Sequence, residues 1–288
     1  MKQTALNKNF LIVDGSHYLY RAYYGVPESA ILRSGLQVNA IYGFMAYLRK
    51  AVTLLSSSHV FVVFDSETGI EHKVEQTESY KANRDYSDTG MYIQLPLIQR
   101  ILDYLNIKYL EPANQEADDY IGSLAKYVCD HVFEATVFSN DADFLQLISN
   151  NIKVLKVGRK SLEIVNQQIF QKLYGFKTSL YIDYLSLKGD NSDNIRGVPG
   201  IGPKTAQKFV SDFGTIESIF INIDKVPGKM HKSLLDYRDL IKNNLQLIKI
   251  STEVLESGLN LLDYKINDSS ELNKSTNYLL DKIGIDTK

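Results

Sequence analysis

The chain has 288 residues, of which 44% are hydrophobic and 23% charged, and this composition is typical of a globular protein with one large α/β domain or two smaller domains. No apolar run reaches the ~18 residues of a membrane span, and the N-terminus lacks a signal-peptide core, so we expect a cytoplasmic protein without a membrane partner. The single cysteine, Cys129, excludes a disulfide framework and a cysteine-only zinc site, and the net charge of −2 alone does not indicate a nucleic-acid binder.

The first part of the chain alternates short apolar strands with helical patterns, which favours a mostly parallel sheet with flanking helices. The expected strands cover 10–13, 59–64, 107–111 and 135–139, with a pair at 152–157 and 162–165 near a sheet edge. The expected helices cover 38–55, about 92–105 and about 117–130. Beyond about residue 178 the pattern is helical and no further strand is expected. We therefore predict an α/β domain over 1–185 and a helical region over 186–288.

Carboxylates follow three of the expected strands. Asp14 ends the first, Asp65 follows the second, and Asp141 and Asp143 follow "ATVFSN". Sites in open α/β sheets form outside the carboxyl ends of the strands, so these acids are expected to share one crevice. Each alone is equally well explained as a turn residue or a helix N-cap.

Two further groups of acids lie outside these strand ends. Glu116, Asp118 and Asp119 stand at an expected helix start, where acids also favour the helix dipole. Asp190 and Asp193 are three residues apart in "KGDNSDNIRG".

Together these nine carboxylates predict a metal centre. Crowded carboxylates raise one another's pKa values unless cations lie between them. Ligands that are all oxygen indicate Mg²⁺, with Mn²⁺ as a substitute, and their number favours two ions, an arrangement typical of phosphodiester hydrolysis. Outside this group, the 32 Lys and Arg residues outnumber the remaining acids.

A glycine-rich turn follows the last acid pair. In "GVPGIGPKTAQKF" a helix is expected to begin at Pro203, so the backbone N–H groups of the turn and the helix N-terminus can bind a phosphate. The pattern indicates a helix-hairpin-helix over about 190–213, and a plain linker with glycine caps is the alternative. The expected DNA-binding residues here are Gly197, Gly200, Gly202, Lys204, Thr205 and Lys208.

A second basic element lies in the polar stretch of about 66–92. Lys81 and Arg84 are three residues apart, with Tyr80 alongside, and Arg21 on the first helix can join them. A mobile arch over a scissile phosphate is one interpretation, and a solvated loop is the other.

Several segments of the chain resemble the motifs of a known family. The segments "LIVDGSHYLYRAYY", "VVFD", "YKANR", "QEADDYIGSLA", "SNDADFLQL" and "LKGDNSDNIRGVPGIGPKTA" resemble, in order, the motifs of the 5′ nuclease or flap endonuclease family. That family includes the 5′–3′ exonuclease domain of bacterial DNA polymerase I. The resemblance covers roughly residues 10–245 and implies a PIN-like 5′ nuclease fold with a helical arch and a helix-hairpin-helix, here as a free-standing protein.

The resemblance also implies roles for individual residues. The first metal site corresponds to Asp14, Asp65, Glu116, Asp118 and Asp119, and the second to Asp141, Asp143, Asp190 and Asp193. Lys81 and Arg84 match the basic pair that polarises the scissile phosphate, and Arg21 matches an arginine near the active site. The turn of the helix-hairpin-helix holds K⁺ in the family.

The expected function is therefore structure-specific 5′–3′ exonuclease and flap endonuclease activity in DNA replication or repair. The expected partner is DNA with a 5′ flap or a 5′ end at a duplex junction, bound by a monomer with a functional link to a DNA polymerase. Two alternatives stay open. The thinly basic arch is compatible with a catalytically weak branched-DNA binding module, and a PIN-type RNA nuclease would share the acids.

Overall fold

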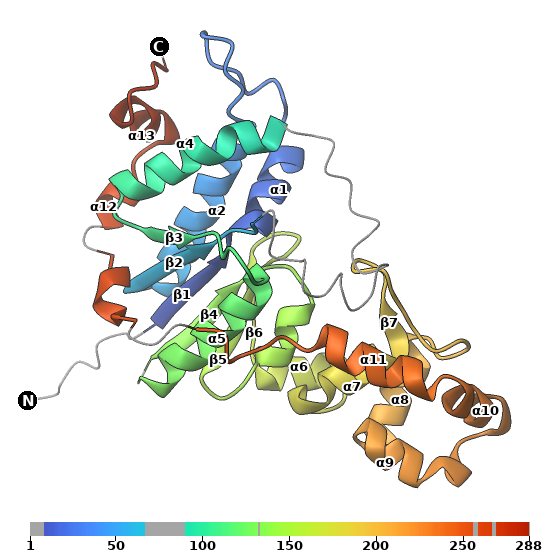
Figure 1. Ribbon diagram of the computed structural model, residues 1–288. Helices are drawn as coiled ribbons and strands as arrows, with labels where there is room; N and C mark the ends of the chain where they lie inside the picture. Colours follow the sequence, from blue (N-terminus) through green and yellow to red (C-terminus); the bar gives the residue numbers. More distant parts are fainter. Residues whose placement is uncertain (1–8, 67–89, 132, 256–258, 267–268, 288) are drawn as a thin grey trace, which may run out of the picture.

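A six-stranded sheet forms the centre of the larger part of the molecule (Figure 1). The computed structural model describes residues 9–66, 90–131, 133–255, 259–266 and 269–287. The strand order is β3-β2-β1-β4-β5-β6, with all neighbours parallel except the antiparallel edge pair β5–β6. This confirms the predicted sheet. The strands are β1 (Asn9–Asp14), β2 (His59–Val63), β3 (Lys108–Leu110), β4 (Glu134–Phe138), β5 (Ile152–Val157) and β6 (Leu162–Val165).

Helices cover both faces of the sheet because successive side chains of its buried strands point to opposite faces. In β1, Leu11 and Val13 join the apolar cluster of one face, and Phe10 and Ile12 join that of the other. The first face is covered by α1 (Gly15–Gly25), α2 (Asn39–Leu55) and α4 (Gly90–Tyr104), and the second by α5 (Ala117–Asp130). These bounds confirm the three predicted helices to within two residues.

Short helices follow the sheet and extend away from it (Figure 1). Their buried side chains, such as Phe209 and Ile241, belong to the same apolar cluster as the α5 face of the sheet. The helices are α6 (Gln167–Tyr174), α7 (Tyr181–Lys188), α8 (Pro203–Phe213), α9 (Ile216–Ile221), α10 (Gly228–Asp236) and α11 (Arg238–Ile248). The expected helix start at Pro203 is confirmed.

One expectation for this region is wrong. Two short strands, β7 (Gly189–Asp190) and β8 (Ile195–Arg196), form an antiparallel hairpin between α7 and α8. Strands of two residues carry no periodicity that a sequence pattern could reveal. The hairpin also depends on a close approach of two backbones, because a Cβ on Gly197 would lie 2.1 Å from the Lys188 carbonyl oxygen.

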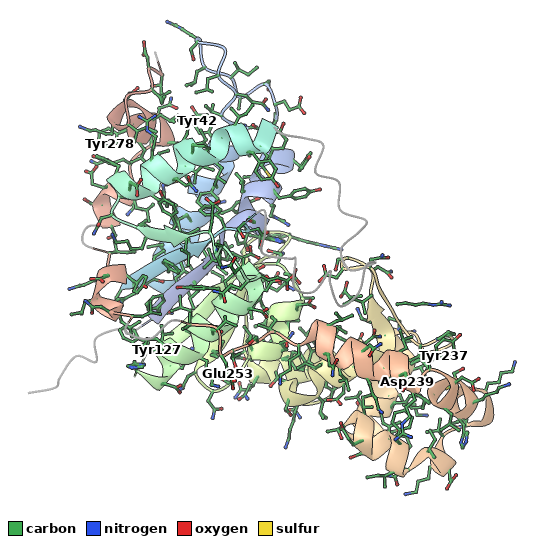
Figure 2. The ribbon with its side chains drawn as sticks, viewed as in Figure 1. Tyr42, Tyr127, Tyr237, Asp239, Glu253 and Tyr278 are labelled. Carbon is green, nitrogen blue, oxygen red and sulfur yellow. The ribbon has the colours of Figure 1, made fainter. Side chains whose placement is uncertain are left out.

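The last described residues return to the sheet. Lys265 forms a bridge with His59 of β2, and Arg49 Nε on α2 donates to the Leu272 carbonyl at 2.8 Å. The final helices, α12 (Ser269–Leu272) and α13 (Thr276–Lys282), therefore pack beside α2 and α4, where Tyr42 and Tyr278 are labelled in Figure 2. Among the helices described, none is long and apolar enough to cross a membrane.

Candidate active site

Three of the predicted acids meet at one edge of the sheet. Asp14 is the last residue of β1, Asp65 follows β2 after one residue, and Asp141 follows β4 after two. Because β2, β1 and β4 are parallel neighbours, their carboxyl ends lie side by side. The negative charges of Asp65 and Asp141 both act on Asp14. These three carboxylates therefore lie at the same edge of the sheet, whereas a crevice that they share stays a prediction.

Asp14 is the buried centre of this group, with 6% of its surface exposed. Its Oδ1 accepts the His17 backbone N–H at 3.0 Å, so it also serves as the N-cap of α1. Its Oδ2 accepts the Ser139 hydroxyl at 2.6 Å. Burial first and the charge of Asp65 second raise the pKa of Asp14 to about 7, despite these two hydrogen bonds.

Serine side chains connect the acids to neighbouring strands. Ser139 Oγ accepts the Asp141 backbone N–H at 2.9 Å, and Asp141 Oδ1 in turn accepts the Asp143 N–H at 2.9 Å. On the other side of β1, Ser16 Oγ accepts the Asp65 N–H at 2.6 Å. Neither serine is among the site residues predicted from the sequence. A hydroxyl residue within two positions of a strand-end acid is the only local signal that could have found them.

The acids of α5 lie in its first turn, as predicted. Glu116 is the N-cap and is 5% exposed, while Asp118 and Asp119 are half-buried. Asp119 Oδ1 accepts the Ser251 backbone N–H at 2.7 Å. One oxygen of Asp119 therefore contacts the segment after α11 rather than the strand-end acids.

Asp190 and Asp193 belong to the β7–β8 hairpin and are 9% and 7% exposed. Asp190 Oδ1 accepts the backbone N–H of Ser192 at 2.8 Å, and Lys188 Nζ lies 3.9 Å from Asp190 Oδ2. Asn244 of α11 holds the base of the hairpin. Its Nδ2 donates to the carbonyls of Ser186 and Arg196, each at 2.9 Å.

The chemistry of the donor set fits divalent cations. All the candidate ligands are carboxylate oxygens, which suit Mg²⁺ and Mn²⁺, and the charge of Asp65 contributes, after burial, to the raised pKa of Asp14. Within the described residues, no three His, Cys, Asp or Glu side chains converge closely enough to form a finished metal site. Binding of an ion would therefore draw these carboxylates together.

The glycine-rich turn has the expected form. Gly200 has a φ of +83°, in the left-handed region that favours glycine, and Gly202 is the N-cap of α8. Lys204 and Lys208 are exposed on α8, Thr205 is half-buried, and the opposite side of the helix is buried. The two lysines therefore share the solvent face of the helix, with the open N-terminus beside them.

Of the positively charged residues predicted near the scissile phosphate, one lies in the described part of the chain and the others do not. Arg21 lies on α1, seven residues after Asp14, and acts electrostatically on His17. The predicted arch residues Tyr80, Lys81 and Arg84 fall in 67–89, outside the described residues.

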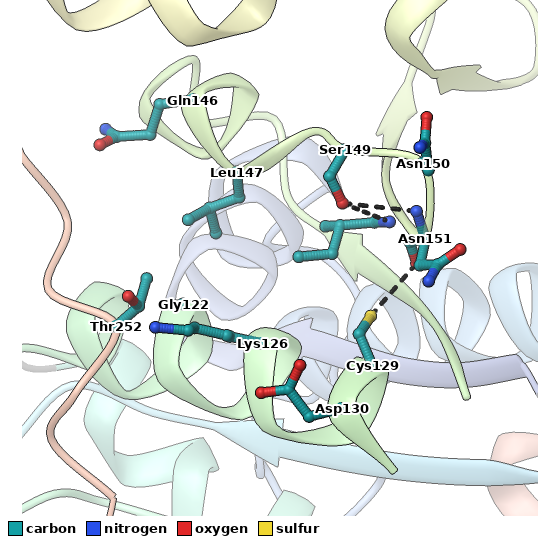
Figure 3. A pocket seen from close by; sticks show the side chains of 11 residues that line it. Gly122, Lys126, Cys129, Asp130, Gln146, Leu147, Ser149, Asn150, Asn151 and Thr252 are labelled. Atoms are coloured by element: carbon teal, nitrogen blue, oxygen red, sulfur yellow. Dashed lines mark hydrogen bonds between the residues drawn. The ribbon is translucent and has the colours of Figure 1, made fainter. Parts of the chain in front are cut away.

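An open groove of about 500 Å³ lies at the opposite edge of the sheet, beside the start of β5 (Figure 3). Lys126, Cys129 and Asp130 of α5 line one side of it, and Ser149–Ile152 line the other. Cys129 Sγ lies 3.4 Å from the Asn151 carbonyl, and burial raises the pKa of its thiol. This groove contains none of the predicted site residues.

Relatives of known identity resemble the chain along most of its length. It is 33% identical to DNA polymerase I of Bacillus caldotenax over 274 residues, which is 93% of this chain and 31% of that protein. It is 34% identical to the thermostable DNA polymerase I of Thermus filiformis over 248 residues, or 86% of this chain and 29% of that protein. The chain thus spans about a third of these relatives.

Two solved structures share the fold. One is a bacteriophage T5 flap endonuclease in a complex with DNA and metal ions, with a TM-score of 0.69, 20% identity, and coverage of 96% of this chain and 99% of that one. The other is the catalytic core of Rad2 with DNA substrate, with a TM-score of 0.61, 17% identity, and coverage of 96% and 92%.

Two family models together match most of the chain. The N-terminal resolvase-like domain of 5′–3′ exonucleases matches residues 9–175, and their C-terminal SAM-fold domain matches residues 176–271. The chain therefore belongs to the 5′–3′ exonuclease family and is an enzyme of the nuclease class.

Proposed function

We propose that this nuclease is structure-specific and hydrolyses DNA at a 5′ single-stranded flap, or at a 5′ end beside a duplex junction. The observation that carries the proposal is the meeting of Asp14, Asp65 and Asp141 at the ends of three neighbouring parallel strands. The likeness to a flap endonuclease structure with DNA and metal ions supports it.

The nine carboxylates are proposed to hold two Mg²⁺ ions, with Mn²⁺ as a substitute. Asp14, Asp65, Glu116, Asp118 and Asp119 form one set, and Asp141, Asp143, Asp190 and Asp193 form the other. When bound, such ions supply a nucleophilic hydroxide and stabilise the attacking and leaving oxygens. The chain itself orients the acids: the Ser139 hydroxyl and the His17 N–H fix both oxygens of Asp14.

Cations on either side of the acids are proposed to position the DNA. The N-terminus of α8 with Lys204 and Lys208 binds the duplex backbone without reading its bases, and the turn before it holds K⁺. Arg21, Lys81 and Arg84 neutralise charge on the scissile phosphate, and Tyr80 contacts the strand. Action as a cytoplasmic monomer beside a DNA polymerase, in replication or repair, stays a prediction, as does the division into domains at residue 185.

A 5′-labelled flap duplex, incubated with Mg²⁺, Mn²⁺ or EDTA, tests the proposal. The expected result is release of the flap near the junction with either metal and none with EDTA. Asp141→Asn should abolish cleavage and retain folding and DNA binding, whereas Asp130→Asn at the opposite edge of the sheet should cleave normally. Tight binding of an intact flap with both metals would support a branched-DNA binding module instead. Preferential cleavage of an RNA flap would support a PIN-type RNA nuclease.

A further inference from the structure

A groove of about 400 Å³ lies beside the acids, on the side of β4 away from Asp65. Arg21 of α1 lines one wall, and Val157, Gly158, Arg159 and Glu163 of the β5–β6 hairpin line the other. Val157 is the only apolar side chain among these five residues. The groove therefore lacks the apolar walls that hold a base or a small organic ligand, and its chemistry suits an anion.

The hairpin is fixed relative to the acids by Asn140, which immediately precedes Asp141. Asn140 Nδ2 donates to the Val157 carbonyl at 2.9 Å, and its Oδ1 accepts the Val157 N–H at 2.8 Å. The turn is closed by a bond from Gly158 N to the Ser161 carbonyl at 2.9 Å. Strands β4 and β5 are paired and about 5 Å apart, so the groove at the end of β5 lies about one strand spacing from the end of β4, a distance comparable with that between consecutive phosphates of a nucleic-acid strand.

Two buried side-chain nitrogens of α1 have no hydrogen-bond partner in the described part of the chain. Arg21 Nε is buried and has no hydrogen-bond partner among the described residues, and the same holds for His17 Nε2 one turn earlier on α1. A buried N–H such as that of Arg21 Nε is destabilising without an acceptor, and a bound phosphate oxygen would supply one. Lys156 adds a positive charge that acts on both Asp141 and Glu163.

Glu163 supplies the one carboxylate among the described residues that line the groove. A Cβ on Gly158 would lie 2.1 Å from Glu163 Oε1, so this carboxylate is folded over the Gly158 backbone. The carboxylate lies next to Lys156, Arg159 and Gly158, and an anionic ligand would compete with it for this position.

We propose that this groove binds the phosphate adjacent to the scissile one on the cleaved DNA strand through Arg159, with Arg21 bridging the two phosphates, and that Glu163 is displaced when the strand enters. The inference rests on the proposed function and adds a phosphate subsite on the β5–β6 hairpin. Its residues differ from the proposed basic pair, Lys81 and Arg84, and from the proposed phosphate-binding lysines of α8.

Binding of a fluorescent flap duplex in EDTA measures the subsite without cleavage. Arg159 is exposed, so Arg159→Gln should fold normally, weaken binding about three- to ten-fold and lower the salt slope by about one phosphate contact. Glu163→Gln should bind about two- to five-fold more tightly. Lys126→Gln, in the groove at the opposite edge, is the matched control and should bind like the unchanged protein.

A series of flaps with one neutral methylphosphonate at each linkage near the junction locates the contact. The Arg159→Gln penalty should vanish for one linkage next to the cleaved one. If Arg159→Gln and Glu163→Gln both bind the flap duplex as tightly as Lys126→Gln does, the subsite is refuted, even when the unchanged protein cleaves the flap. If the unchanged protein binds but does not cleave with Mg²⁺, the proposed nuclease activity fails, and these binding results still decide the subsite. No binding of DNA at all would overturn both.

Discussion

The Ser139 hydroxyl donates to Asp14 Oδ2 at 2.6 Å and thereby connects the ends of strands β4 and β1. Ser139 is completely buried, and its oxygen also accepts the Asp141 N–H. One side chain thus orients an acid of each proposed metal set. Partners that orient metal ligands affect metal binding almost as strongly as the ligands do.

Ser139→Ala should weaken metal-dependent cleavage about 10- to 100-fold, because Asp14 and Asp141 lose the group that orients them. The loss should appear mainly as a higher Mg²⁺ concentration for half-maximal cleavage. A Mg²⁺ titration of flap cleavage measures it. Ser149→Ala, a loop serine at the opposite edge of the sheet, is the control and should leave the titration unchanged. An unchanged titration for Ser139→Ala would show that Asp14 is positioned without this hydrogen bond.

Asp14→Asn should stabilise the metal-free protein at pH 8. The pKa of Asp14 is about 7 in the folded protein and 3.8 in the unfolded chain, so its stabilising contribution is complete below pH 3.8 and is lost as pH rises through 7. At about 1.4 kcal/mol per pKa unit, the effect is on the order of 4 kcal/mol. Chemical unfolding in EDTA at pH 5 and pH 8 measures the part of this effect that falls between the two pH values, about 3 kcal/mol. Mg²⁺ should stabilise the unchanged protein at pH 8 and not the variant, and equal stabilisation of both would argue against Asp14 as a ligand.

Asp183→Asn should reduce a second loss of folding stability that occurs as pH rises. This loss does not depend on metal. Asp183 is 9% exposed, and burial raises its pKa above 3.8 although its Oδ1 accepts the Ile216 N–H at 2.8 Å. Its contribution is present below pH 3.8 and is lost as pH rises through the folded value. Asparagine keeps the acceptor and removes the buried charge. Urea unfolding of Asp183→Asn should show a smaller loss of stability between pH 4.5 and pH 7.5 than the unchanged protein does. Asp236→Asn, which changes an exposed acid, is the control and should behave like the unchanged protein. An equal loss of stability in all three proteins would contradict the assignment.

Asn244→Leu should destabilise the protein by about 1–3 kcal/mol, because one buried and one partly buried carbonyl lose their common donor. Those carbonyls belong to Ser186 and Arg196, on either side of the hairpin that carries Asp190 and Asp193. Cleavage should therefore need more Mg²⁺, even well below the melting temperature. Asn243→Leu, exposed on the same helix, should change neither property. A loss of stability together with a normal Mg²⁺ titration would show that the hairpin does not contribute to the metal site.

Two glycines of the turn before α8 should behave differently. Gly197→Ala should destabilise the fold, because its Cβ would lie 2.1 Å from a backbone carbonyl oxygen. Gly202→Ala meets nothing within 4 Å, so it should cost at most about 1 kcal/mol through the N-cap and still weaken DNA binding where the backbone approaches phosphate. Thermal melting and flap binding in EDTA measure the two effects. Normal binding by folded Gly202→Ala would refute a phosphate contact at this N-cap.

The sequence by itself determined the strands of the main sheet and the positions of the acids that follow them. Runs such as 10–13 and 59–64 can only be buried strands at this length and composition, so the acids after them had to lie at the carboxyl edge of a parallel sheet. The family motifs along the chain could likewise be recognised without the three-dimensional structure.

Only the tertiary structure decided the contacts that cross between distant segments. Ser139 meets Asp14 across 125 positions of sequence, and Asp119 meets Ser251 across 132. The β7–β8 hairpin and the groove between Arg21 and Arg159 likewise form only when the sheet and its helices pack together. Hydrophobic periodicity records which face of an element is buried, whereas the partner of each polar group depends on which strands become neighbours, and that is settled by packing of the whole chain.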